Sequence, residues 1–120
     1  AKILTNEMRF EKREIVKAII LNSKNIIIKI VDICYGGTNS AMLSPKDVLH
    51  EAIKIEAPKI ILVHNHPSGD PMPSKKDLEF TERLIQASKI LGIQLLDHIV
   101  IGEFGYSSIF QEMLNQENKM

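Results

Sequence analysis

The feature that most constrains this chain is a short apolar run that ends in two histidines. Lys59 is followed by Ile-Ile-Leu-Val up to Val63, which predicts a buried β-strand. His64 and His66 come next, and residues two apart point the same way in extended chain. A fold built around this strand therefore brings both imidazoles to one side of its sheet.

Further strand patterns lie on both sides of this run. Two segments rich in branched side chains, 14–21 and 26–33, are separated by residues 22–25 (Asn-Ser-Lys-Asn), which have turn chemistry, so we expect a hairpin. Another strand is expected over 93–101, followed by a loop over 102–108. The last residues of the chain predict a short helix that frays.

Two longer helices are expected, and each begins with the same local signal. Ser44 and Ser74 each precede an acid by three residues, Asp47 and Asp77, which is the pattern of a capping box. Gly92 predicts the end of the second helix. The expected apolar stripes are Val48, Leu49, Ala52 and Ile53 in the first helix and Phe80, Leu84, Ala87 and Leu91 in the second.

The order of these elements, β-β-α-β-α-β, is typical of an α/β fold. We expect a mixed β-sheet flanked by helices, with a ligand site at the carboxyl end of a central strand. A length of 120 residues with 44% apolar content suits one domain with a modest core.

Charge and cysteine content indicate the setting. Fifteen basic residues balance fifteen acidic ones, so the chain lacks the basic excess of a typical duplex-binding domain. Cys34 is the only cysteine, which excludes an internal disulfide and suits a reducing cytoplasm. No apolar stretch is long enough to cross a bilayer. Because the chain begins with Ala1 rather than Met, we expect a piece of a longer protein.

A metal site is expected where the two histidines meet the second helix. Asp77 shares a helical face with Phe80 and Leu84, so its carboxylate should point inward and needs a compensating partner. A cation held between His64, His66 and Asp77 would supply that partner. Two histidines and one carboxylate leave a fourth tetrahedral position open, which is typical of a catalytic zinc rather than a structural one.

Simpler explanations remain open for each residue taken singly. His64 can be a hydrogen-bonded core histidine, and Ser74 with Asp77 can be only a helix cap. No thiolate lies near in sequence, so zinc is the default metal, although copper or nickel can compete for such a site. Zinc nucleobase deaminases need His-x-Glu with Pro-Cys-x-x-Cys, and this chain lacks both.

The same residues resemble a known family. His64-x-His66, Pro67, Gly69 and Ser74-x-x-Asp77 resemble the JAMM signature of the MPN/JAB1-like metalloprotease superfamily. The longer run from His64 to Pro71, with Pro73-Ser74 and Leu96-Asp97-His98-Ile99, resembles its bacterial RadC branch. The resemblance implies a deaminase-like α-β-α sandwich, with 1–120 as a single MPN/JAMM-like domain. RadC-like proteins carry a helix-hairpin-helix segment before this domain, so the resemblance implies the C-terminal domain of such a protein.

The resemblance also implies roles for single residues. It makes His64, His66 and Asp77 the zinc ligands and Ser74 the hydrogen-bond donor to a developing oxyanion. It aligns Glu14 with the glutamate that acts as general base.

Two of these choices stay open when only the residues are considered. Glu7, Glu11 and Asp32 are alternatives to the glutamate that the resemblance selects. In the Asp97-His98 pair, alternation sends the two side chains to opposite faces, so one of them can orient a ligand imidazole. A simple hydrogen bond at the end of a strand is the competing explanation.

The expected function is that of a zinc-dependent metallohydrolase of peptidase or isopeptidase type, with a peptide or protein substrate. The alternative is a non-catalytic metal-binding interaction module, and the DNA-repair label of RadC-like proteins belongs with that alternative. Neutral net charge argues against direct nucleic-acid binding by this domain. We expect no membrane partner. The sequence does not indicate which oligomeric state the protein adopts.

Overall fold

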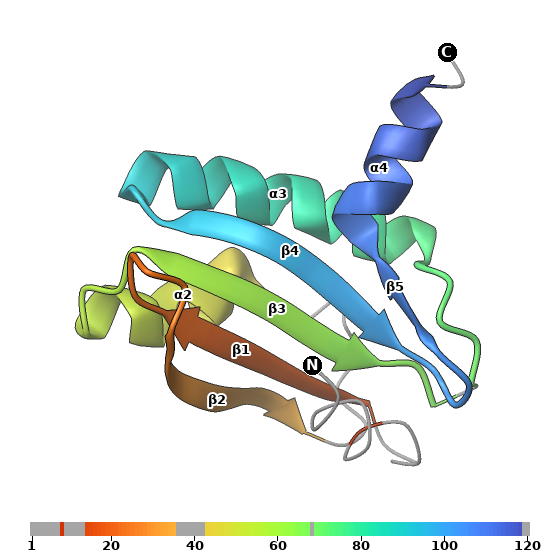
Figure 1. The fold of residues 1–120 in the computed structure, drawn as a ribbon, viewed down its shortest axis with the longest axis horizontal. Coiled ribbons are helices and arrows are strands. Elements are labelled where there is room, and N and C mark those ends of the chain that lie inside the picture. Colours follow the sequence, from red (N-terminus) through yellow and green to blue (C-terminus); the bar gives the residue numbers. More distant parts are fainter. Residues whose placement is uncertain (1–7, 9–13, 36–42, 68, 119–120) are drawn as a thin grey trace.

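The computed structural model describes residue 8 and residues 14–35, 43–67 and 69–118. Its strands are β1 (Ile15–Leu21), β2 (Ile27–Tyr35), β3 (Lys59–Asn65), β4 (Gln94–Ile101) and β5 (Tyr106–Ser108). Its helices are α2 (Pro45–Lys54), α3 (Lys75–Leu91) and α4 (Ile109–Asn118). The described part of the chain is shown in Figure 1.

The strands form one sheet in the order β2-β1-β3-β4-β5, with β3 in the centre. Strand β3 runs parallel to β4, whereas the β1–β2, β1–β3 and β4–β5 pairs are antiparallel. The predicted α/β class and mixed sheet are therefore confirmed. The predicted hairpin is confirmed as well, because β1 and β2 pair across a turn in which Asn25 adopts a positive φ of 64°.

The main core lies between the sheet and the helices α2 and α3. In Figure 1, α2 lies behind the strands and α3 runs beside β4. Val48, Leu49 and Ala52 of α2 and Leu84 of α3 pack against buried strand residues such as Leu62. A second cluster, which includes Met8, Ile19 and Val63, lies on the other face of the sheet. The strand that leads to the two histidines is thus buried on both faces.

Three local expectations were wrong. Residues 106–108 were expected to be a loop but form β5, because Gly102 N–H bonds the Gly105 carbonyl at 2.8 Å and closes a hairpin with β4. The three residues of β5 are too few to show an alternating pattern in sequence. Ile53 and Leu91 were placed in the apolar stripes but are 47% and 51% exposed, since the buried faces stop short of the ends of both helices.

The helix boundaries follow the predicted caps. Both capping boxes form, and Gly92 ends α3 in the left-handed conformation with φ of 72°. None of the described helices combines the length and apolar character needed to span a bilayer. Gly36 and Gly37, which follow β2 in the sequence, lie outside the described residues.

Candidate metal centre

Strand β3 carries the first histidine to the helix-covered side of the sheet. His64 pairs with Val16 of β1 and Val100 of β4 and is only 3% exposed. The ladder continues one residue past the strand, because His66 N–H bonds the Ile101 carbonyl at 2.9 Å. The two imidazoles therefore stay on the same side, as the period-2 spacing predicts.

A tight loop holds the second histidine in place. Gly69 N–H bonds the His66 carbonyl at 2.9 Å, and Glu103 N–H bonds the Gly69 carbonyl at 3.0 Å. Gly102 lies so close to this loop that a Cβ there would come within 2.3 Å of the Gly69 oxygen. Only glycine fits at that contact. His66 Nδ1 then donates to the Asp70 carbonyl at 2.9 Å, which fixes the orientation of the ring.

The first turn of α3 brings the carboxylate. Asp77 N–H bonds Ser74 Oγ at 3.1 Å, and Ser74 N–H bonds Asp77 Oδ2 at 2.8 Å, so the capping box is complete. The same carboxylate is 6% exposed and lies 3.0 Å from His66 Nε2 and 3.4 Å from His64 Nε2. Asp77 is therefore a helix cap and at the same time a candidate metal ligand, so these two interpretations of the sequence are compatible.

The three side chains form a group that can hold a metal ion. One ligand atom from each of His64, His66 and Asp77 lies within 4.8 Å of the others, and the two Nε2 atoms are 3.0 Å apart. A carbonyl can only accept, so the bond to Asp70 puts the proton of a neutral His66 on Nδ1 and turns the Nε2 lone pair toward the group. Acceptors this close repel unless a cation lies among them. Two imidazoles and a carboxylate are a donor set that zinc accepts.

The pKa shifts agree with a cation-binding group. Burial alone would raise the pKa of Asp77, but the imidazoles of His64 and His66 beside it outweigh burial and hold that pKa well below its usual range. The pKa of His66 is raised, first by its hydrogen bond to Asp77 and then, against a lowering by burial, by the Asp70 carbonyl. The group favours positive charge beside the carboxylate.

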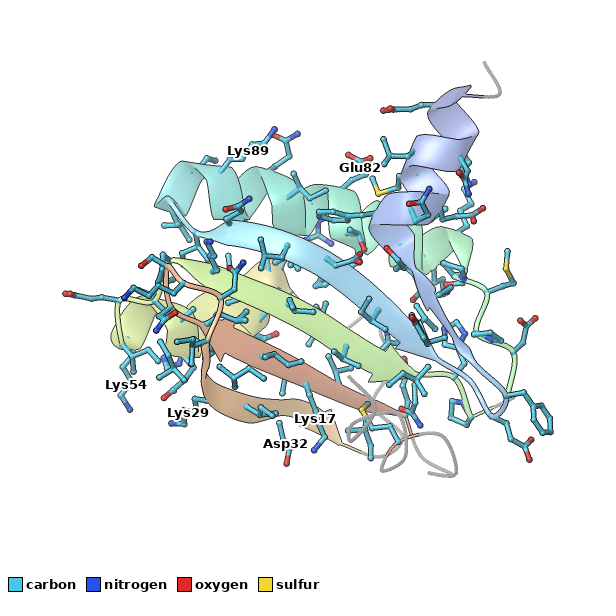
Figure 2. The ribbon with its side chains drawn as sticks, viewed as in Figure 1. Lys17, Lys29, Asp32, Lys54, Glu82 and Lys89 are labelled. Atoms are coloured by element: carbon cyan, nitrogen blue, oxygen red, sulfur yellow. The ribbon has the colours of Figure 1, made fainter. Side chains whose placement is uncertain are left out.

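Glu14 lies beside this group. It immediately precedes β1, is half-buried, and lines a narrow cavity of about 20 Å³ together with His64, Asp77 and Phe80. The alternative acid Asp32 lies elsewhere, because it pairs with Lys17 at 3.1 Å on the exposed edge of the sheet (Figure 2).

The other two alternatives to Glu14, Glu7 and Glu11, lie outside the described residues. Ser74, the expected oxyanion donor, is exposed at the rim beside the same carboxylate. Its Oγ accepts from Asp77, and its own hydrogen is given to no partner among the described residues.

A β-bulge decides which residue of the Asp97-His98 pair reaches the ligands. Ile60 pairs with Leu95 but Ile61 pairs with Asp97, so Leu96 is an extra residue in β4 and reverses the alternation after it. His98 consequently faces the helices, 2% exposed, with Nε2 2.7 Å from His64 Nδ1.

Asp97 is turned away from the ligand group. Its carboxylate accepts from Ser108 Oγ at 2.6 Å and from Phe110 N–H at 3.3 Å, so it joins β4 to the start of α4. The contact with a ligand imidazole is thus made by His98. Thr81 was not predicted from the sequence, yet its Oγ1 lies 2.6 Å from His98 Nδ1. Its place four residues after Asp77 on a helix was the available signal.

Comparison with known proteins agrees with this arrangement. A family model described as the RadC-like JAB domain matches residues 1–115. A UPF0758 protein of Clostridium acetobutylicum is 47% identical over 114 residues, which are 95% of this chain and 50% of that protein. UPF0758 proteins of Clostridium botulinum (strain Alaska E43) and Syntrophomonas wolfei are each 46% identical, over 91% and 90% of this chain and 48% and 46% of their own lengths.

The chain therefore spans about half the length of the curated relatives it matches. The family match, the mixed sheet and the clustered His64, His66 and Asp77 all agree with the resemblance found in the sequence. This chain belongs to the RadC-like JAB domain family.

Proposed function

We propose that this domain is a zinc-dependent hydrolase of peptidase or isopeptidase type. The observation that carries the proposal is the convergence of His64 Nε2, His66 Nε2 and an Asp77 carboxylate oxygen within 4.8 Å, next to a cavity lined by Glu14. Three protein ligands leave one tetrahedral position open for chemistry. Zinc held there would supply Lewis acidity toward a scissile carbonyl and acidify a nearby water.

The neighbouring side chains suit the proton transfers of amide hydrolysis. The cavity of about 20 Å³ has room for roughly one water molecule. Glu14 at its wall would take a proton from the attacking water and pass it to the leaving amine. Ser74 would donate its unused hydroxyl hydrogen to the oxyanion that develops on the carbonyl.

The test combines metal analysis with a substrate search. Protein purified without chelator should carry about one zinc per chain, and Asp77→Asn should carry none, because it loses a charged ligand. Zinc-loaded protein is then screened against peptide and isopeptide-linked libraries. Glu14→Gln should keep its zinc but lose about 100- to 10,000-fold in rate, since an amide cannot take the proton.

The outcomes separate the parts of the proposal. Wild-type protein that binds no zinc would refute the metal centre. Unchanged turnover in Glu14→Gln would move the base to another acid. A zinc-loaded wild type that cleaves no library member would refute the hydrolase and favour the alternative below.

The alternative is a non-catalytic metal-binding interaction module, and one feature favours it. A cavity of about 480 Å³ opens on the sheet face opposite the metal group, lined mainly by apolar side chains such as Ile19, Ile61 and Ile99. Such a surface suits a partner. An association with DNA repair belongs to this alternative. A cytoplasmic location is proposed for either function and is supported by the lone Cys34.

A further inference from the structure

A chain of hydrogen bonds runs from the backbone of α3 to the candidate ligand His64. Thr81 Oγ1 lies 2.7 Å from the Asp77 carbonyl and 2.6 Å from His98 Nδ1. His98 Nε2 in turn lies 2.7 Å from His64 Nδ1. All of these side chains are buried, with Thr81 at 0% and His98 at 2% exposure. Water therefore cannot replace a missing partner in this series of hydrogen bonds.

The direction of each bond follows from what its atoms can do. A carbonyl oxygen only accepts, so the single hydrogen of the Thr81 hydroxyl goes to Asp77. Toward His98 the hydroxyl oxygen must then accept, which places the His98 proton on Nδ1. Buried and uncharged, His98 has no proton on Nε2, so that atom accepts from His64 Nδ1–H. The lone pair of His64 is left on Nε2, the atom that faces His66 and Asp77.

We propose that Thr81 and His98 are positioning residues that hold His64 in the tautomer whose Nε2 can bind a metal. The inference rests on the proposed metal centre and extends it to two buried residues outside the ligand set. Its anchor is the main chain of Asp77, whose side chain is itself a candidate ligand. One helical turn of α3 thus supplies a ligand directly and orients a second one through two intermediaries.

The electrostatics of His98 support this direction. His98 is 2% exposed, and burying a charged imidazole costs free energy, so the neutral form is favoured. A neutral imidazole can donate at one nitrogen while it accepts at the other. A charged His98 would donate at both nitrogens and would leave His64 Nδ1 as an acceptor, with its proton on Nε2.

The first experiment reads the tautomers directly. Long-range ¹H–¹⁵N spectra of the protein labelled with ¹⁵N-histidine should show His64 and His98 each protonated at Nδ1 in the metal-free protein. Assignment comes from single His→Gln variants. An Nε2 proton on His64 in the metal-free protein would overturn the inference. Because this measurement needs no metal, it stands even if the wild type binds no zinc and the proposed function fails.

The second experiment breaks this series of hydrogen bonds at the buried hydroxyl of Thr81. Thr81→Val keeps the side-chain shape but removes both hydrogen bonds, so His98 loses the partner that holds its proton on Nδ1. Zinc affinity, measured by competition with a chromogenic chelator, should fall about 10- to 100-fold. Thr81→Ser restores the hydroxyl and should restore most of that affinity, together with the wild-type tautomers.

Ser88 offers a matched control. It is a buried hydroxyl two turns further along the same face of α3, and its Oγ has no hydrogen-bond partner among the described residues. Ser88→Ala should therefore leave zinc affinity and the His64 tautomer unchanged. If circular dichroism shows that Thr81→Val is folded but the variant keeps wild-type zinc affinity and histidine tautomers, the positioning role of Thr81 is refuted. An equal loss of affinity in Ser88→Ala would also refute it, because the effect would then be general to the helix. If Thr81→Val does not fold, Thr81→Ser and the tautomer spectra decide.

Discussion

The helices α2 and α3 begin with the same four-residue motif, yet the two motifs do different things. Ser44 and Asp47 open α2, and Ser74 and Asp77 open α3, each with a serine cap and an acid three residues on. In α2 the acid is exposed and its carboxylate is engaged by the backbone and hydroxyl of its own cap. In α3 the acid is 6% exposed and also reaches His64 and His66.

The serine hydroxyls differ as well. Ser44 Oγ donates its hydrogen to Asp47 Oδ2 at 3.0 Å, whereas Ser74 Oγ accepts from Asp77 N–H at 3.1 Å and gives its hydrogen to no partner in the part of the chain that the structure describes. In the capping box of α2, the backbone N–H and the hydroxyl of Ser44 both bond the Asp47 carboxylate. The capping box of α3 has a spare donor and a carboxylate that needs a positive partner. A local motif can therefore specify where a helix starts without specifying whether its residues have a further role.

The largest expected difference between the boxes is in metal binding. Asp77→Asn should lower zinc affinity by more than the roughly 100-fold that loss of an outer partner costs, because it removes a charged ligand. Asp47→Asn, the matched change in α2, should leave zinc affinity as in the wild type. Chelator competition on both variants measures this. Equal affinities in the two variants would contradict the metal centre.

The next difference concerns the two serines. Ser74→Asp keeps an oxygen that can accept from Asp77 N–H but loses the donor, so it should reduce hydrolysis by about 100- to 1,000-fold with zinc retained. Ser44→Asp should leave the rate unchanged but lower the melting temperature, since it sets a second carboxylate beside Asp47 in place of a donor. Paired rate and melting curves give the comparison. A Ser74→Asp variant that keeps its hydrolytic activity would make Ser74 only a cap, whatever its melting temperature.

A smaller effect is expected from a change at the loop that orients His66, which lies beside the capping box of α3 and has no counterpart described at α2. Gly102→Ala would place a Cβ 2.3 Å from the Gly69 oxygen and shift the loop that orients His66. Zinc affinity should fall about 10-fold and stability by about 1–3 kcal/mol. Gly105→Ala is the control, because a Cβ there meets nothing within 4 Å. Similar losses in both variants would show that the close contact is not the cause.

The smallest expected effect is a pH dependence of the α2 box. The Ser44 N–H and then its hydroxyl lower the pKa of Asp47 from 3.8. A lowered folded-state pKa means that this carboxylate stabilises the protein above about pH 3.8 and that the stabilisation is lost as pH falls through the folded value. In urea titrations, wild type should exceed Asp47→Asn by less than about 1 kcal/mol at pH 7. The gap should close as the pH falls from about 3.8 through the lower folded-state value, and a gap independent of pH would contradict this assignment.

Much of the architecture could be read from the sequence. The strand that ends at His64, the hairpin, both capping boxes and the Gly92 stop depend on neighbours within a few residues, so local patterns reveal them. The mixed sheet follows from their order. The three-residue β5 escaped prediction because its pairing with β4 depends on a hairpin rather than on its own side chains.

The candidate site also combines features that local sequence patterns predict with features that only the tertiary structure sets. The spacing of His64 and His66 and the inward face of Asp77 come from the periods of strand and helix, and they determined that two imidazoles and a carboxylate would converge. Tertiary structure alone placed Glu14 at the cavity and Asp32 on the sheet edge.

Tertiary structure alone also turned His98 rather than Asp97 toward the candidate ligand His64. That choice depends on Leu96, an extra residue in β4 opposite the step from Ile60 to Ile61. A bulge reflects the packing of a whole sheet against its helices, and a single strand carries no local signal for it. Local periodicity determined which three side chains converge at the candidate site, whereas the register between distant strands decided which buried residue contacts them.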